Sequence, residues 1–156
     1  MKFIILGSGS SMGVPRPDGF FGKCDPKNPK NLRLRCSALI KSKDINILID
    51  TSPDLRIQML KNRIISLDTV MYTHHHADQT HGINDLRVFF LKRKKEIPVY
   101  ADKNTKKYLV DSFSYCFRGS KEYPPLLRLF DIKKNFKLGK FINVESVKVR
   151  DGSINS

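Results

Sequence analysis

Short apolar runs alternate with polar or glycine-containing turns along most of the chain, a pattern typical of β-strands. Residues 2–6 form the first run, which ends at a glycine. Runs 36–41 and 45–49 flank a polar turn of three residues and predict a hairpin. Later apolar runs predict strands over 68–73, 97–101, 126–130, 135–138 and 141–150.

Helical signals occur between these strands. Ser52 is a suitable N-cap and Pro53 a suitable first helical residue, so we expect a helix over 53–62. A second helix is expected over 103–117. Its expected buried side comprises Tyr108, Leu109, Ser112 and Cys116 or Phe113. The order of strands and helices predicts an α/β fold, in which a mixed sheet carries the helices on one face.

One segment lacks any regular pattern. Residues 8–35 contain four prolines and four glycines, so they cannot form a regular helix or strand. The segment is also too long to serve only as a connection. We therefore expect an irregular loop that carries part of the function.

Composition limits the class of protein. The chain has 156 residues, of which 40% are hydrophobic, and fits a single domain over 1–156. It lacks an apolar stretch of roughly 20 residues and a signal-peptide pattern, so we expect a cytoplasmic protein with no membrane partner. Three widely separated cysteines indicate free thiols. A metal site at Cys24 and Cys36 is a less favoured alternative, because the chain has no C-x-x-C pair.

The charge favours anionic partners. The net charge is +14, from 29 basic and 15 acidic residues, and the tightest basic run is 92–95. Such a field attracts nucleotides, phosphodiesters or RNA. The alternative is that the excess of lysine is a general property of the composition, distributed over solvated faces.

All four histidines lie in one short window, 74–81. Alternate residues of an extended segment point the same way, so His74 and His76 can face one metal ion, with the carboxylate of Asp78 close by. Gln79 is a neutral and weak oxygen donor at the next position. The alternative, a polar loop that contains histidines by chance, explains this clustering poorly.

Three sequence motifs resemble those of a known protein family. They are Gly7–Pro15 after the first strand, Leu48–Arg56 after the third and Thr73–Asp78 after the fourth. In this order they resemble the metallo-β-lactamase-fold hydrolases, and the pattern is most similar to the phosphoribosyl cyclic phosphodiesterase branch, which is related to the tRNA 3′-processing endonucleases. Residues 80–87 fit that branch too. The resemblance implies an αββα sandwich of which this chain supplies an incomplete, N-terminal half.

The resemblance also implies a set of metal ligands. Members of the family bind two ions through a His-x-His-x-Asp-His loop, in which His74, His76 and Asp78 match three positions. Asp78 is the expected catalytic residue, because it would orient the attacking hydroxide. Gln79 stands where the family has its last histidine, and no histidine follows His81. We therefore expect one weakly bound ion, zinc or another divalent metal such as manganese.

Other residues near the loop are assigned supporting roles. By the same resemblance, Asp50 would lie behind the metal ligands and brace their loop, although a simple turn aspartate is an equal alternative. His75 is expected to point away from the metals, and His81 to pack nearby. Either could replace a missing ligand.

These expectations favour a metal-dependent hydrolase that acts on a phosphodiester or cyclic nucleotide-like substrate. We expect its activity to be impaired, because Gln79 replaces a ligand and the later ligands of the family are absent. One alternative is a split hydrolase completed by a second-half chain or by self-association. Another, from a different class, is a non-catalytic basic module that binds nucleic acid through 8–35 and 92–95.

Overall fold

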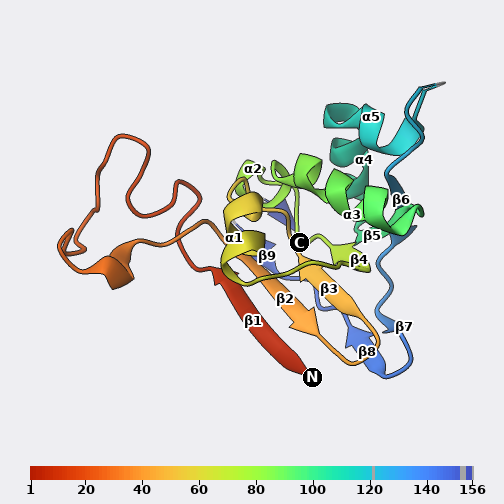
Figure 1. Cartoon of the computed structure of the whole chain (residues 1–156), viewed down its shortest axis with the longest axis horizontal. Coiled ribbons are helices and arrows are strands. Elements are labelled where there is room, and N and C mark those ends of the chain that lie inside the picture. Colours follow the sequence, from red (N-terminus) through yellow and green to blue (C-terminus); the bar gives the residue numbers. More distant parts are fainter. Residues whose placement is uncertain (121, 152–153, 156) are drawn as a thin grey trace.

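A six-stranded sheet forms the centre of the protein in the computed structural model, which describes residues 1–120, 122–151 and 154–155 (Figure 1). The strands lie in chain order: β1 (Lys2–Gly7), β2 (Ser37–Lys41), β3 (Asn46–Ile49), β4 (Thr69–Met71), β5 (Ile97–Ala101) and β6 (Leu127–Asp131). The first three strands pair antiparallel, and β3 to β6 pair parallel. The sheet is therefore mixed, as the sequence predicted.

The main helices cover one face of this sheet. They are α1 (Leu55–Lys61), the 3-10 turn η2 (Ile83–Leu86) with α3 (Arg87–Arg93), and α4 (Lys103–Ser112) with α5 (Ser114–Arg118). Each group joins two adjacent parallel strands, and crossovers of one hand place all of them on the same side. One buried cluster unites the two layers; it includes Leu55, Leu86, Leu109, Leu48, Val70 and Val99. The predicted α/β class with helices on one face is confirmed.

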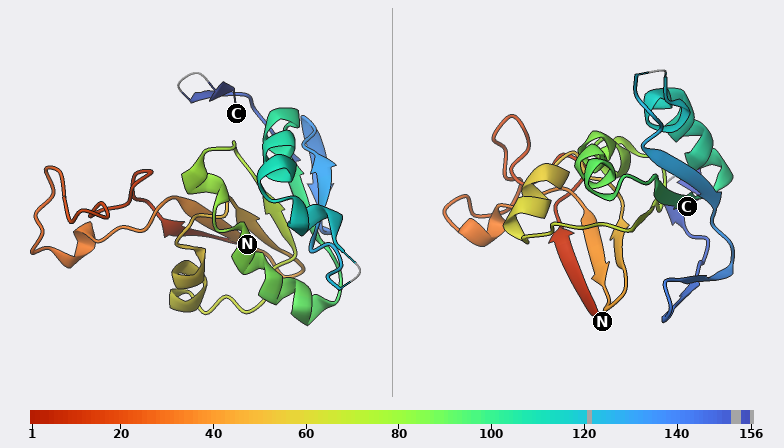
Figure 2. Two further views of the ribbon diagram at one scale, coloured as in Figure 1. Left: turned by 90° about the horizontal axis from the view of Figure 1, so that it is seen from above. Right: turned by 45° about the vertical axis from the view of Figure 1, so that its right-hand side comes forward.

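The opposite face carries a small hairpin, formed by β7 (Asn135–Leu138) and β8 (Ile142–Glu145). Leu138 and Ile142 of this hairpin pack with Ile47 in a second, smaller apolar cluster. A further pair, β9 (Arg150–Asp151) and β10 (Ile154–Asn155), forms a separate ladder. Figure 2 shows that the helices and the β7–β8 hairpin lie on different sides of the sheet.

Residues 8–35 project from the end of β1 as an extended arm (Figures 1 and 2). As predicted, the arm is irregular, and its short helix is the 3-10 turn η1 (Pro29–Asn31). Its base is held at the sheet by a bidentate ion pair, in which the guanidinium of Arg35 donates to both carboxylate oxygens of Asp54. The guanidinium of Arg35 holds the pKa of Asp54 below its usual range. The arm thus has a fixed attachment to the start of α1.

Two helix predictions were wrong in their boundaries. Helix α1 begins at Leu55 because Pro53 and Asp54 form a turn, in which Ser52 Oγ accepts from the Asp54 amide. The predicted helix 103–117 breaks at Phe113, whose φ of −131° is not helical.

The break at Phe113 has a tertiary cause. Its ring packs against Tyr108 and edge-on against His81, while the carbonyl of Cys116 accepts the amide of Leu126. Leu109 and Cys116 are buried as expected, but Ser112 is exposed.

The predicted strand 141–150 was also wrong. Strand β8 ends at Glu145, and residues 146–149 form an irregular segment before Arg150, where the short β9 ladder begins. The amide of Ser146 instead donates to the carbonyl of Lys134, which closes the hairpin. No helix among the described residues is long and apolar enough to cross a membrane.

Candidate metal centre

The histidine loop leaves the carboxyl end of β4 and enters the one-turn helix α2 (Ala77–Thr80). Two backbone hydrogen bonds fasten it to the segment that follows β3. The Thr51 amide donates to the Gln79 carbonyl at 2.7 Å, and the Gly82 amide donates to the Thr51 carbonyl at 2.8 Å. The loop therefore lies where two adjacent parallel strands end, the usual position for sites in open α/β sheets.

His74 and His76 face one another. The Nε2 atom of His74 lies 2.9 Å from the Nδ1 atom of His76, and the two rings meet edge to face. Two nitrogen ligands at about 2.0–2.1 Å from a tetrahedral zinc ion are roughly 3.3 Å apart. A small outward rotation of the exposed His76 ring would thus admit a metal ion. The histidine pair therefore has the ligand type of a metal site, and its nitrogen–nitrogen distance is slightly shorter than a bound zinc ion requires.

A buried carboxylate supports this pair through Thr73. Asp50 is only 3% exposed, and its two oxygens accept the amide and the hydroxyl of Thr73, each at 2.8 Å. The Thr73 hydroxyl also lies 2.9 Å from Nδ1 of His74. Burial raises the pKa of Asp50 to about 7, although the two donors from Thr73 oppose the shift. Asp50 has a positive φ of 60°, which turns its side chain toward the histidine loop at a cost in backbone strain.

Asp78 and Gln79 form a second small group. The Gln79 amide nitrogen donates to Oδ2 of Asp78 at 3.0 Å, while Gln79 Oε1 is buried and has no hydrogen-bond partner among the described residues. The charge of Asp78 acts on both Asp50 and Arg35. Asp78 therefore lies close enough to Asp50 and Arg35 for its charge to act on both, and its side chain accepts a hydrogen bond from Gln79.

Within the described part of the chain, no three His, Cys, Asp or Glu side chains gather closely enough to hold a metal. The structure brings His74 and His76 together without completing a three-ligand set. The assignment of Asp78 as a ligand of the same ion stays a prediction.

The other two histidines pack against aromatic rings of the helical layer. His75 lies 5.3 Å from the ring of Tyr108 between centroids, and its buried Nδ1 has no hydrogen-bond partner in the described residues. His81 lies edge-on to Phe113 at 5.4 Å and contacts the hydroxyl of Thr80 at 3.1 Å. Their role as replacement ligands stays a prediction.

Thr73 is the site residue that sequence reasoning missed. The only local signal is a hydroxyl residue directly before His74, which any loop can contain. Its importance depends on Asp50, 23 residues earlier in the chain, and becomes visible only when β3 and β4 are paired.

Two residues of the basic run 92–95 have structural contacts. Lys92 Nζ donates to the Ile65 carbonyl, and Arg93 donates to the Leu67 carbonyl and to Asp68. These bonds fasten α3 to the segment before β4. Nucleic-acid binding by this run and by the arm stays a prediction.

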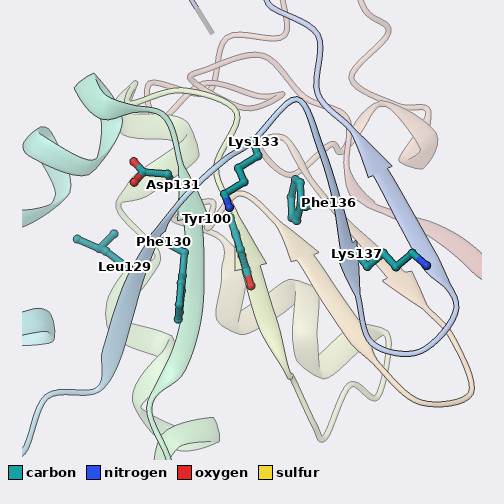
Figure 3. A pocket seen from close by; sticks show the side chains of 7 residues that line it. All are labelled: Tyr100, Leu129, Phe130, Asp131, Lys133, Phe136 and Lys137. Carbon is teal, nitrogen blue, oxygen red and sulfur yellow. The ribbon is translucent and has the colours of Figure 1, made fainter.

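The cysteines and a hollow beside the sheet are further candidate sites. Cys24, Cys36 and Cys116 are free thiols, and none belongs to a metal-holding group among the described residues. A hollow of about 410 Å³ opens beside β5, β6 and β7, where Tyr100 stacks between Phe130 and Phe136 (Figure 3). None of the predicted site residues lines it.

Known proteins resemble this chain in sequence and in fold. An octanoyltransferase from Porphyromonas gingivalis (strain ATCC BAA-308 / W83) is 38% identical over 159 residues, which cover 99% of this chain and 32% of that protein. A crystal structure described as a new diphosphatase from the PhnP family superposes with a TM-score of 0.83 at 30% identity, over 98% of this chain and 58% of that one. The chain thus spans about a third of the curated relative and little more than half of the diphosphatase.

More distant structures share the fold alone. Zn²⁺-bound PqqB from Methylobacterium extorquens superposes with a TM-score of 0.64 at 18% identity, over 88% of this chain and 48% of that one. The long form of RNase Z from yeast superposes with a TM-score of 0.54 at 18% identity, over 83% of this chain and 18% of that one. Residues 45–155 match the family described as Beta-lactamase superfamily domain. The chain belongs to this superfamily and has a metallo-β-lactamase-like fold.

Proposed function

We propose that the chain forms part of a metal-dependent hydrolase that cleaves phosphodiester or diphosphate bonds. The observation that carries the proposal is the 2.9 Å approach of His74 Nε2 and His76 Nδ1 at the carboxyl edge of the sheet. The superfamily match and the likeness to a diphosphatase support the type of reaction.

The residues have distinct roles in this proposal. His74 and His76 would hold a divalent ion, which would lower the pKa of a bound water and polarise a phosphoryl oxygen. Asp78 would accept a hydrogen bond from that water and so orient it. His76 is exposed, so substrate can reach the pair from solvent. Asp50 keeps the loop in place through Thr73.

Further ligands are needed for a hydrolytic site. Catalytic zinc takes three protein ligands and keeps an open position, whereas the described residues bring two histidines together. We infer that the remaining ligands come from a segment equivalent to the part of the diphosphatase that these 156 residues do not span. That segment can belong to the same polypeptide, to another chain or to a second copy.

Gln79 limits the activity that the proposal allows. An amide oxygen is a weaker ligand for zinc than imidazole, so a second ion would be held poorly even where other ligands are supplied. Loss of a second ion removes part of the stabilisation of the charge that develops on phosphate. We therefore expect the 156-residue chain to show little or no phosphodiesterase activity by itself.

Zinc titration by calorimetry tests the histidine pair. The purified 156-residue chain should bind one zinc ion weakly, His76→Ala should abolish the binding, and His81→Ala should retain it. Equal binding by the parent chain and by His76→Ala would refute the proposed centre.

The Gln79→His substitution tests whether Gln79 weakens the binding of a second metal ion. Metal analysis should show more bound metal per chain in the variant than in the parent. A bis(4-nitrophenyl) phosphate assay on the same samples measures phosphodiesterase activity. Two tightly held ions in the dialysed parent chain, or vigorous turnover that chelators abolish, would show that Gln79 does not impair the site.

A further inference from the structure

The arm, residues 8–35, carries positive charge that the fold neutralises only in part. It contains six basic and two acidic residues and projects away from the sheet (Figures 1 and 2). Arg35 pairs with Asp54 at the base of the arm, and Arg16 pairs with Asp18 farther along it. Within the described part of the chain, the other four cations of the arm have no carboxylate partner.

Three of these cations are lysines at short intervals, Lys23, Lys27 and Lys30, and all three are exposed. The nearby Asp25 accepts the backbone amide of Lys27 and pairs with no ammonium group among the described residues. The three charges are spread along an extended segment, whereas a small anion is held best by donors that converge on one point. Their arrangement therefore suits a partner that carries a row of negative charges.

An aromatic ring stands beside these cations. Phe20 lies in a turn in which its carbonyl accepts the Arg16 amide at 3.0 Å and its own amide donates to the Asp18 carboxylate at 3.2 Å. The Arg16 guanidinium carbon lies 4.7 Å from the centroid of the ring and covers one face of it. Phe20 is nevertheless 55% exposed, which leaves aromatic surface for another planar group.

An unpaired nucleobase suits this ring better than a lipid surface or a duplex does. Insertion of Phe20 into lipid would also take the ion pair of Arg16 and Asp18 out of water, and burial of charges is costly. In a duplex the faces of the bases are already covered by their neighbours. The bases of a single strand are open to stacking on aromatic side chains.

The base of the arm adjoins the histidine loop. Val14 and Arg33 exchange two backbone hydrogen bonds, of 3.0 and 2.8 Å, which hold the outgoing and returning segments of the arm together. The pKa of Arg35 is raised by its hydrogen bond with Asp54 and also by the charge of Asp78. A strand bound along the arm would thus have its continuation close to the candidate metal centre.

We propose that the arm binds single-stranded nucleic acid, with a base stacked on Phe20 and with phosphates at Lys23, Lys27 and Lys30. Cleavage of a strand held in this way rests on the function proposed above, and makes a polynucleotide the substrate of that hydrolase. Binding by the arm itself needs no metal. The basic run 92–95 is not required, because Lys92 and Arg93 fasten α3 to the segment before β4.

Fluorescence anisotropy with labelled single strands of about 12 nucleotides, oligouridylate and oligothymidylate, tests the proposal in the presence of EDTA. The combined variant Lys23→Gln, Lys27→Gln and Lys30→Gln should bind about tenfold more weakly at about 0.1 M KCl. Its plot of log affinity against log salt should be less steep by about 2, because each lost phosphate contact removes about 0.7 from the slope.

Two further variants separate stacking from general charge. Phe20→Ala should bind about tenfold more weakly with an unchanged salt slope, because it removes stacking and no charge. The matched control replaces three exposed lysines outside the arm by glutamine and so removes the same charge. It should keep the parent affinity and slope to within about twofold. These lysines are Lys41, Lys43 and Lys61.

Several outcomes would overturn the proposal. They are the absence of oligonucleotide binding, equal losses in the arm variant and its matched control, and equal affinity for a duplex of the same length. Binding to phosphatidylglycerol vesicles without binding to either oligonucleotide would show that the arm is a membrane contact instead. Tighter binding of one single strand supports the proposal and shows whether RNA or DNA is preferred.

The test also separates the arm from the metal centre. His76→Ala should bind both oligonucleotides as the parent chain does, because the arm is intact in this variant. If the arm variants lose binding as expected but zinc binds equally to the parent and to His76→Ala, the hydrolase proposal fails and the role of the arm stands.

Discussion

Gly82 lies where the chain that leaves the histidine loop meets the residues after β3. Its φ of −86° is ordinary, so the requirement for glycine comes from space alone. A Cβ atom at this position would lie 2.0 Å from the Ser52 carbonyl oxygen. The hydrogen bond from the Gly82 amide to Thr51 shows how closely the two segments approach.

Gly82→Ala should therefore lower the free energy of unfolding by roughly 1–3 kcal/mol, because the backbone must move to admit the methyl group. Urea denaturation measures this change. Asn84→Ala, at an exposed residue two positions later, is the control and should change the stability by less than about 0.5 kcal/mol. Similar stabilities for the two variants would contradict the close contact.

Asp50 gives a second prediction at the residue scale, and its sign follows from the raised pKa. The ordinary value is 3.8 and burial raises it to about 7, so between these pH values the folded protein holds a proton that the unfolded chain has lost. The stabilisation from this group is complete below about pH 4 and disappears as the pH rises through 7.

The free energy of unfolding of the parent chain, minus that of Asp50→Asn, should thus fall as the pH rises from about 4 to 7. Denaturation curves across this range measure it. The exposed Asp18, whose pKa is lowered by its hydrogen bond with Arg16, is the control, and Asp18→Asn should show no such fall. A flat difference for Asp50→Asn would mean that Asp50 is ionised throughout.

Helix α4 links the helical layer to the histidine loop at the scale of elements. Asp102 caps its N-terminus, with carboxylate oxygens that accept the amides of Thr105 and Asn104. Tyr108 of the same helix packs against His75. Movement of the helix end would therefore reach the loop through this ring contact.

Asp102→Ala should destabilise the protein by about 1 kcal/mol through loss of the cap. Thermal unfolding followed by circular dichroism measures the change. Asp111→Ala, which removes an exposed pair with Lys107 in the last turn, should cost less than about 0.5 kcal/mol. Equal losses would show that the cap contributes no more than a surface ion pair.

At the scale of the whole molecule, a row of apolar residues crosses all six strands on the sheet face opposite the helices. The pairing registers align these residues one per strand: Ile5, Ala38, Ile49, Met71, Tyr100 and Phe130. The β7–β8 hairpin packs on part of this face, but Phe3 and Ile5 of the edge strand β1 are 63% and 66% exposed. Apolar surface of this kind favours association with another surface.

We predict that the 156-residue chain self-associates as its concentration rises. Replacing Phe3 and Ile5 together by serine should weaken the association, since both are already exposed and contribute little to the core. Phe20→Ser, at a similarly exposed phenylalanine of the arm, is the control and should leave association unchanged. Sedimentation velocity over a concentration series measures it, and a monomer at every concentration would refute the prediction.

The sequence by itself determined the six strands of the main sheet to within a few residues, the irregular arm and the proximity of His74 and His76. Each of these depends on neighbours a few residues away: the period of two in an extended chain, the turn preferences of glycine and proline, and the alternation that points every second side chain the same way. The same local patterns, together with three short motifs, were sufficient to indicate the superfamily.

Only the tertiary structure decided how these pieces meet. The register that pairs Ile49 with Met71 brings Asp50 beside Thr73, and thereby brings a carboxylate to the histidine loop. Packing of Phe113 against His81 breaks a helix that the periodicity had extended through it. Such contacts join residues more than 20 positions apart, and their energies depend on distances that no local pattern encodes.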